Sequence, residues 1–522
     1  MSNTYIGLTI GPIFDTLNLA STPAALWAGS YLFSSLTRTI CELLVSEKYN
    51  IPAEYIVSPY FEPDAPLLNR KDGVGLFHDR VIFRVDDAHP FEDKEISSLR
   101  TAALEIISKD FTVDYDYLNE YIMVTGCRFT AENAILGSAV RLDSLELAKP
   151  FVQQEECNAL FALFVNEGSE NGNQRIKELP VVKALDQWQL LKKNGSIRSL
   201  SDIASGGKEP TMKKQTYYAI VRSDGDRMGK ILEKLNGDSE IRLYSKTCLQ
   251  FCSSIAEVVS VYGGFTIYSG GDDLLAILPL ENPSCTEVSD IFSFLKKANS
   301  LFKDSFRKLF MELNQSAGRE AFNLDTDLPT LSFGVSVNYH KHPLYEAMQD
   351  SGYLLFGIAK DRNSDPERRD CTAIRFQKHA GQSEGLLIRN DALDMLINFK
   401  KEIDAGVMQE DGSKVILSAL HKISLFGSFY SIAQDDDSVN NLFNNFFDAD
   451  SHAGNSFLKT FLPTQFNELR KSNAVDLLPD YRMEFLREAG KTEDNKELLP
   501  VQVLGYLLRI FKLYKERIGE RT

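Results

Sequence analysis

Two segments of the chain combine short β-prone runs with long amphipathic stretches. The first opens with the apolar run YIGLTI, turns at Gly11-Pro12 and continues into STPAALWAGSYLFSSLTRTICELL, where Ser21 or Thr22 can cap a helix that has Pro23 in its first turn. The stretches GLFHDRVIFRV and EISSLRTAALEIISKDF then predict a strand and another helix. The pattern predicts a strand-led unit at the start of the chain.

A second strand-led unit follows a long polar stretch. From Tyr115 to about Leu191 the pattern is mainly helical, and residues 192–216 are rich in Gly, Ser and Lys, which favours a domain boundary. The stretch TYYAIVRSDGDRMGKILEKL then predicts a strand, a turn and a helix for which Asp226 is available as the N-terminal acid. Beyond about Leu386 the sequence predicts helices and no further strand-led unit.

A hairpin with acids at its tip is the most distinctive local pattern. The β-prone runs FTIYS and DLLAILPL are joined by Gly270-Gly271, which predicts a tight turn between two strands. Asp272 and Asp273 stand at this turn, directly before buried-type residues, where adjacent negative charges are costly. If the strand ending in Asp224 lies beside this tip, three carboxylates share one sheet edge and suit a hard divalent cation such as Mg²⁺.

This arrangement fits nucleotidyl transfer by two metal ions. Carboxylate-bound metals can hold a nucleoside triphosphate and activate a ribose hydroxyl for attack on the α-phosphorus. The turn from Gly225 to Gly229 would point backbone N–H groups at phosphate from a helix N-terminus. The neighbouring GDRMGK lacks the spacing of a Walker A motif, so the site is of the palm type. Taken singly, Asp224 could be a helix cap and Lys360 a solvated residue at a helix end.

Composition and charge narrow the class of protein. A chain of 522 residues with 43% apolar content predicts about three or four domains. The net charge of −16 argues against holding nucleic acid by an overall field, so RNA contacts would be local or made by partners. The seven cysteines form no CxxC pair, and no basic leader or membrane-length apolar run occurs. We therefore expect a cytoplasmic protein with no membrane contact.

Three stretches carry a family resemblance. YYAIVRSDGDRMGK, IYSGGDDLLAILP and LSFGVSVNYHKHPLYEAMQDSGYLLFGIAKD resemble the active-site strands and the following helix of the large polymerase/cyclase subunit of type III, Cmr-type CRISPR effector complexes. LTIGPIFDTLNLASTPAALWAGSYLFSSL is similar to the opening of that family, so the resemblance runs in patches over about residues 5–385. It implies an α+β fold with two ferredoxin-like palm domains related to nucleotide cyclases and GGDEF enzymes, the first degenerate, and with helical domains after each.

The resemblance also sets the expected domains. We expect a degenerate palm at residues 1–115, a helical domain and linker at 116–210, the catalytic GGDD palm at 211–385 and a C-terminal helical domain at 386–522.

The resemblance implies a target-RNA-activated nucleotidyltransferase in an antiviral complex. Its substrate would be ATP and its product an AMP-containing second messenger, either a cyclic oligoadenylate or AMP joined to another acceptor such as S-adenosylmethionine. Guide RNA and target RNA would be contacted mostly through other subunits. A stand-alone cyclic mono- or dinucleotide synthase and an inactive scaffold are the alternatives. The intact acids argue against the scaffold, and the long helical C-terminal region argues against a synthase with one palm.

The family's functional residues map onto this sequence by position. Asp224, Asp272 and Asp273 would be catalytic and would hold two Mg²⁺ or Mn²⁺ ions. The lysine that such palms place against the triphosphate matches Lys360. The nucleotide-binding residues would be Gly225, Asp226, Arg227, Met228, Gly229, Gly270, Gly271 and Lys360.

Two departures from the family pattern limit what we expect. Many members begin with an HD nuclease domain, whereas here the first palm strand starts at Tyr5, so we expect no HD domain and no DNA cleavage. Many also carry four cysteines in the helical domain after the first palm. Only Cys127 and Cys157 fall in that region here, so we expect no zinc site.

Overall fold

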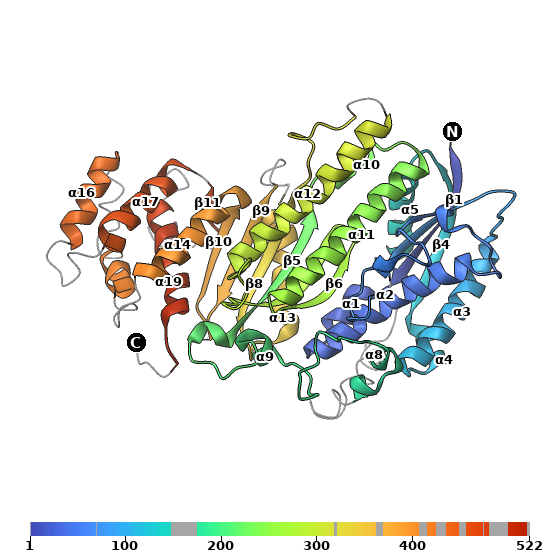
Figure 1. The fold of residues 1–522 in the computed structure, drawn as a ribbon, viewed down its shortest axis with the longest axis horizontal. Helices are drawn as coiled ribbons and strands as arrows, with labels where there is room; N and C mark the ends of the chain where they lie inside the picture. Colours follow the sequence, from blue (N-terminus) through green and yellow to red (C-terminus); the bar gives the residue numbers. More distant parts are fainter. Residues whose placement is uncertain are drawn as a thin grey trace.

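The computed structural model describes residues 2–68, 70–147, 175–317, 321–361, 369–379, 381–406, 415–423, 435–447, 456–472, 474–479 and 499–518. Along the long axis of the molecule, an N-terminal unit is followed by a central sheet and then by the C-terminal helices (Figure 1). Among the described residues, no helix combines the length and the apolar character that crossing a membrane requires.

The N-terminal unit is a four-stranded antiparallel sheet with strand order β2-β3-β1-β4. This order and the intervening helices give the βαββαβ topology of ferredoxin-like folds. Its elements are β1 (Asn3–Gly11), α1 (Ile13–Asn18), α2 (Pro23–Val45), η1 (Ala53–Tyr55), β2 (Ile56–Ser58), η2 (Pro66–Leu68), β3 (Arg80–Val85), α3 (Asp93–Phe111), α4 (Tyr115–Tyr121), β4 (Met123–Ala131) and α5 (Ala134–Leu147).

Local sequence signals account for the first elements. Thr22 caps α2, because its side-chain oxygen accepts a hydrogen bond from the Ala25 N–H, and Pro23 occupies the first turn as predicted. The prediction of a mainly helical pattern from Tyr115 is wrong for β4, which pairs with β1 along its whole length. The domain boundary predicted at residue 115 is therefore misplaced, because it separates β4 from the other strands of the first sheet. A strand with Gly and Cys among partly exposed positions shows little of the usual β-type alternation.

The central unit repeats the same topology. Its strands β6-β7-β5-β8 follow the order of β2-β3-β1-β4, and the sheet continues through β9, β10 and β11 to seven strands. Between the two units lie α8 (Pro180–Lys183), α9 (Leu200–Ser205) and η3 (Lys213–Thr216). The central elements are β5 (Tyr217–Gly225), α10 (Met228–Leu232), α11 (Gly237–Val261), β6 (Phe265–Gly270), β7 (Asp273–Pro279), α12 (Ile291–Ala317), β8 (Leu331–Tyr339), α13 (Leu344–Gly352), the π-helix η4 (Tyr353–Ala359), β9 (Cys371–Gln377) and β10 (Ser383–Arg389).

Helices cover the C-terminal end of the central sheet. These are η5 (Asn390–Ala392), α14 (Leu393–Gly406), α16 (Asp436–Phe447), the π-helix η6 (Phe457–Phe461), α17 (Leu462–Lys471) and α19 (Leu499–Lys515). Strand β11 (Val475–Leu477) returns from this region to pair with β10. The expectation of helices alone beyond Leu386 is therefore wrong, and the boundary predicted at residue 385 falls inside β10. A strand of three residues is too short to give a periodic pattern.

The two sheet units are packed tightly together. Ser30 on α2 donates a hydrogen bond to the Ile267 carbonyl at 2.7 Å, and the Ser269 N–H donates to the Gly75 carbonyl at 3.3 Å. At the other end of the interface, the Tyr5 hydroxyl donates to Asp238 at 2.6 Å. The N-terminal unit thus contacts β6 directly, one residue before the glycines of the hairpin.

Helices α11 and α12 lie across one face of the central sheet (Figure 1), and α13 with η4 packs against β8 and β9. The contact with β8 is made at Gly334, where an added Cβ would meet the Ser351 carbonyl oxygen and, at 2.5 Å, the Leu355 backbone nitrogen. The absence of a side chain at this position lets the helix reach the strand.

We predict that Gly334→Ala lowers the thermal unfolding midpoint, because the new methyl group must displace helix backbone and not a flexible side chain, at a cost of roughly 1–3 kcal/mol. Gly505→Ala is the matched control, since an added Cβ in α19 meets no atom within 4 Å and alanine favours a helix by up to about 1 kcal/mol. Differential scanning calorimetry of both variants measures the effect. Equal midpoints for the two variants would contradict this account of the packing.

Candidate active site

The C-terminal end of β5 is the centre of the candidate site. This strand pairs with β7 on one side and with β8 on the other, with Ser223 opposite Leu274 and Gly225 opposite Leu331. The residue after Ser223 is Asp224, and the residue before Leu274 is Asp273, so the antiparallel register puts these two acids at the same sheet edge. Tertiary pairing thus brings together two motifs separated by 48 residues in the sequence.

The predicted hairpin is present. Strands β6 and β7 pair up to Gly270 and Asp273, so Gly271 and Asp272 form the turn. Gly271 has φ +68°, in the left-handed region that residues with a Cβ seldom adopt. The turn itself therefore explains Gly271, whereas Gly270 is the last residue of β6.

The two hairpin acids face different surroundings. Asp272 lies over Gly225, where its Oδ2 is 2.6 Å from the position of a Cβ added to that glycine. Burial raises the pKa of Asp272 to about 6, although backbone N–H groups that include that of Gly225 oppose the shift. Burial and the neighbouring Asp272 raise the pKa of Asp273 well above its ordinary value, while the Arg222 guanidinium opposes this. Both carboxyls are thus short of compensating positive charge.

Lys360 reaches the end of β5 from the π-helix η4. Its N–H donates to the Leu355 carbonyl, a bond over five residues that marks the π-helix, and such turns are frequent at functional sites. The Lys360 ammonium forms an ion pair with Asp224 and donates a hydrogen bond to the Gly225 carbonyl at 2.8 Å. The structure therefore brings Lys360 to the acid of β5, which its position in the sequence could not indicate.

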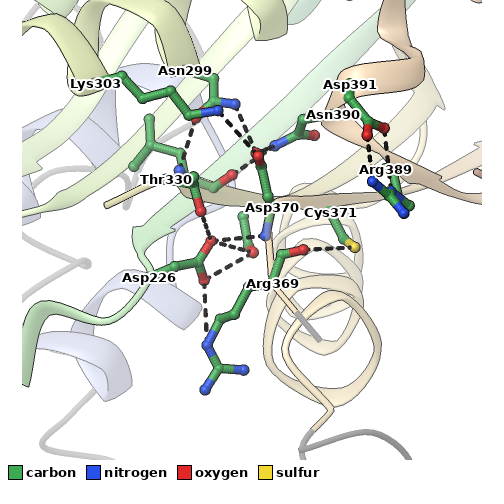
Figure 2. A network of polar contacts seen from close by, with 12 residues as sticks. Asp226, Asn299, Lys303, Thr330, Arg369, Asp370, Cys371, Arg389, Asn390 and Asp391 are labelled. Carbon is green, nitrogen blue, oxygen red and sulfur yellow. Dashed lines mark hydrogen bonds and ion pairs between the residues drawn. The ribbon is translucent and has the colours of Figure 1, made fainter. Parts of the chain in front are cut away.

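Asp226 does not cap a helix, contrary to the prediction. Helix α10 is a five-residue turn that begins after Arg227, whose φ is +66°, and it has no side-chain cap. The Asp226 carboxylate is instead buried and accepts hydrogen bonds from the Thr330 and Ser332 hydroxyls (Figure 2). Burial raises the pKa of Asp226 above its usual value. The predicted phosphate cradle from Gly225 to Gly229 therefore has only a short helical turn behind it.

The oxygen atoms available to a metal ion lie on Asp224, Asp272, Asp273 and the Gly225 carbonyl. Across the described part of the chain, no three carboxylate, imidazole or thiol groups form a ready-made ligand set. At the candidate site, the acids do not already form a ligand set for two reasons. Lys360 is paired with Asp224, and the two hairpin acids face different surroundings. Of the two cysteines considered for zinc, Cys127 lies on β4, and Cys157 lies outside the described residues.

A cavity lies beside the hairpin, between the two sheet units. Its lining includes Asp79 and Phe14 from the N-terminal unit and Arg222, Asp273 and Phe356 from the central unit. Arg222 was not among the predicted site residues, although a basic residue within an apolar strand two positions before Asp224 was a usable signal. Phe14 and Phe356, exposed by 65% and 53%, gave no such signal, because single exposed aromatic residues are common.

Part of the chain is similar in sequence to known proteins. Residues 217–370 match the family described as Cas10/Cmr2, second palm domain. The CRISPR system Cmr subunit Cmr2 of Pyrococcus furiosus is 26% identical over 243 residues, which are 41% of this chain and 24% of that protein. The matched segment thus spans about a quarter of the length of this curated relative.

Solved structures share the fold at low sequence identity. The type III-B Cmr-beta complex bound to cognate target RNA contains a chain that matches with a TM-score of 0.52 and 12% identity, covering 98% of this chain and 83% of that one. The Csm1-Csm4 cassette in complex with cA3 matches with a TM-score of 0.50 and 13% identity, covering 98% and 69%. The chain is therefore similar to Cas10-like large subunits, and residues 217–370 match the second palm domain of Cas10/Cmr2.

Proposed function

We propose that this protein is the nucleotidyltransferase of a type III CRISPR complex and converts ATP into an AMP-containing second messenger. One observation carries the proposal: within the family's second palm domain, the acid that ends β5, the two acids of the glycine hairpin and Lys360 lie at one sheet edge. This set combines ligands for hard cations with a basic group for phosphate.

The donor set fits Mg²⁺ or Mn²⁺. Asp224, Asp272, Asp273 and the Gly225 carbonyl supply hard oxygen ligands, and a bound cation would offset the burial that raises the pKa values of the hairpin acids. When bound, such ions supply Lewis-acid activation of the attacking hydroxyl and neutralise charge on the phosphate.

The chain's own residues would then bind and orient the nucleotide. Lys360 gives a positive charge at the triphosphate, and its pairing with Asp224 keeps it at the sheet edge. Gly270 and Gly271 have no side chains, so that phosphate could approach the backbone on this arm of the hairpin. The positive charge of Arg222 favours the ionised form of the Asp273 carboxyl.

The acceptor of the AMP group is either ATP or another molecule such as S-adenosylmethionine. The Csm1-Csm4 cassette in complex with cA3 supports a cyclic oligoadenylate. The related Cmr-beta complex bound to target RNA supports an assembly in which partner subunits hold the RNA. The net charge of −16 agrees with that division, because a strongly acidic chain is poorly suited to hold an RNA duplex by itself.

We predict that Asp272→Ala combined with Asp273→Ala lowers product formation from labelled ATP by roughly 10²-fold or more, while the protein still folds and assembles. The matched control is Asp86→Ala with Asp87→Ala, an adjacent exposed acid pair just after β3. Mass spectrometry identifies the product, and thermal unfolding reports the fold. Undiminished product from the hairpin variant would remove this hairpin from the reaction.

We predict opposite effects of pH on activity and on the stability of the metal-free protein. Because the pKa of Asp272 is raised from 3.8 to about 6, ionising it destabilises the fold as pH rises through this range. Asp272→Asn should therefore raise the free energy of unfolding by about 1–3 kcal/mol at pH 8, and the unfolding midpoint with it. Near pH 4 the substitution should change this free energy very little. Wild-type activity should rise through pH 6, where the metal ligands ionise. A pH-independent gain would contradict the burial of this carboxyl.

We predict that target RNA controls the reaction through the geometry of the hairpin and β5. The rates of product formation are compared for the chain alone, the complex with guide RNA, and the complex with guide and matched target. The expected result is little product except in the third sample. Equal rates in all three would favour a stand-alone synthase, and no product in any of them would favour a scaffold.

A further inference from the structure

The Asp226 carboxylate, which follows β5, receives groups from three other elements near the candidate site. Thr330 and Ser332 stand at the start of β8, and Arg369 and Asp370 precede β9 (Figure 2). Lys360 follows η4. The Asp226 side chain is 0% exposed, so it cannot itself contact a nucleotide. A buried carboxylate with this many partners must be explained by what it holds in place.

Both oxygens of Asp226 contact the Ser332 hydroxyl, at 3.0 Å from Oδ1 and 2.9 Å from Oδ2, and their other partners differ. Oδ2 accepts hydrogen bonds from the Thr330 hydroxyl at 2.6 Å, the Ser332 hydroxyl at 2.9 Å and the Asp370 N–H at 3.0 Å. Oδ1 lies 3.5 Å from the Lys360 ammonium and 3.9 Å from Nε of Arg369. Neutral donors thus fix the carboxylate, chiefly through Oδ2, and Oδ1 also faces two cations.

The contacts of Asp370 fix the backbone next to Arg369. The backbone of Asp370 is in the left-handed region at φ +55°, and its carboxylate accepts hydrogen bonds from Asn299 and Asn390 and pairs with Lys303 at 3.1 Å. Figure 2 shows these contacts around Asp370, next to those of Asp226. The backbone that carries Arg369 is therefore fixed from the side away from Asp226.

We propose that Arg369 is a second phosphate-binding cation of the site and that Asp226 is the positioning residue that holds Arg369 and Lys360 side by side. This inference rests on the proposed nucleotidyltransferase function. The ligand class is the triphosphate of a nucleotide, because three site acids would repel a polyanion unless more than one cation offset them. Arg369 and Lys360 are only 15% and 10% exposed, so little water competes with a bound phosphate.

If Arg369 binds phosphate, its loss should weaken the binding of a triphosphate more than that of a monophosphate. A purely structural role would weaken the binding of both nucleotides alike. Binding of a non-hydrolysable ATP analogue and of AMP to the full-length chain is measured by calorimetry in Mg²⁺. We expect Arg369→Ala to weaken binding of the ATP analogue roughly tenfold or more and to leave AMP binding almost unchanged. Arg389→Ala is the control, because Arg389 pairs with Asp391 at an exposed position and should affect neither ligand.

A double-mutant cycle tests the role of Asp226. Asp226→Asn should weaken binding of the ATP analogue, and the loss should shrink markedly when Arg369→Ala is already present. A purely structural Asp226 would give additive losses. If Asp226→Asn does not fold, Thr330→Val loosens the same carboxylate without changing charge and should produce a smaller loss that also depends on Arg369.

The outcomes also distinguish this inference from the proposed function. Unchanged affinity for the ATP analogue in Arg369→Ala, equal losses for this analogue and AMP, or additive losses in the cycle would overturn the inference while wild-type product formation remained. If the wild-type complex formed no product and the wild-type chain did not bind the ATP analogue, both proposals would be wrong.

Discussion

The antiparallel pairing of β5 with both of its neighbours is the constraint on which the site depends. Because β7 and β8 are hydrogen-bonded to opposite sides of this strand, the hairpin acids and the hydroxyls at the start of β8 arrive at its C-terminal end together. A shift of one residue in either ladder would turn the acids to the other face. The apolar residues of β5 are buried on both faces, and this burial fixes the register.

Several charged side chains lie close together at this sheet edge. Asp224, Asp226, Asp272 and Asp273 lie within one region, where Lys360 is paired with the first two and Arg222 lies near the last. The hairpin acids remain under-compensated, and their raised pKa values record the cost. Such a cost is common where a protein positions groups to bind a charged ligand.

The N-terminal unit repeats the topology of the central palm and packs against it. Its strands follow the same order as those of the central palm, but β1 ends in Ile10-Gly11 where β5 ends in Asp224-Gly225. The first unit therefore offers no acid of its own at the end of its central strand. It contacts the second unit at β6 through Ser30 and Gly75, so it supports the strand that leads into the hairpin.

The sequence by itself determined the local elements and the chemical identity of the site. The glycine turn with its acids, the strand before Asp224 and the capped helix at Pro23 follow from residue type and spacing, and motif resemblance selected the family. Only the tertiary structure decided that β4, β9, β10 and β11 join the sheets, because the formation of a strand depends on its neighbours in the sheet more than on its own sequence. It likewise decided that Asp226 is a buried acceptor and that Lys360 and Arg369 meet there. These contacts join residues more than 100 positions apart, and local sequence carries no signal for them.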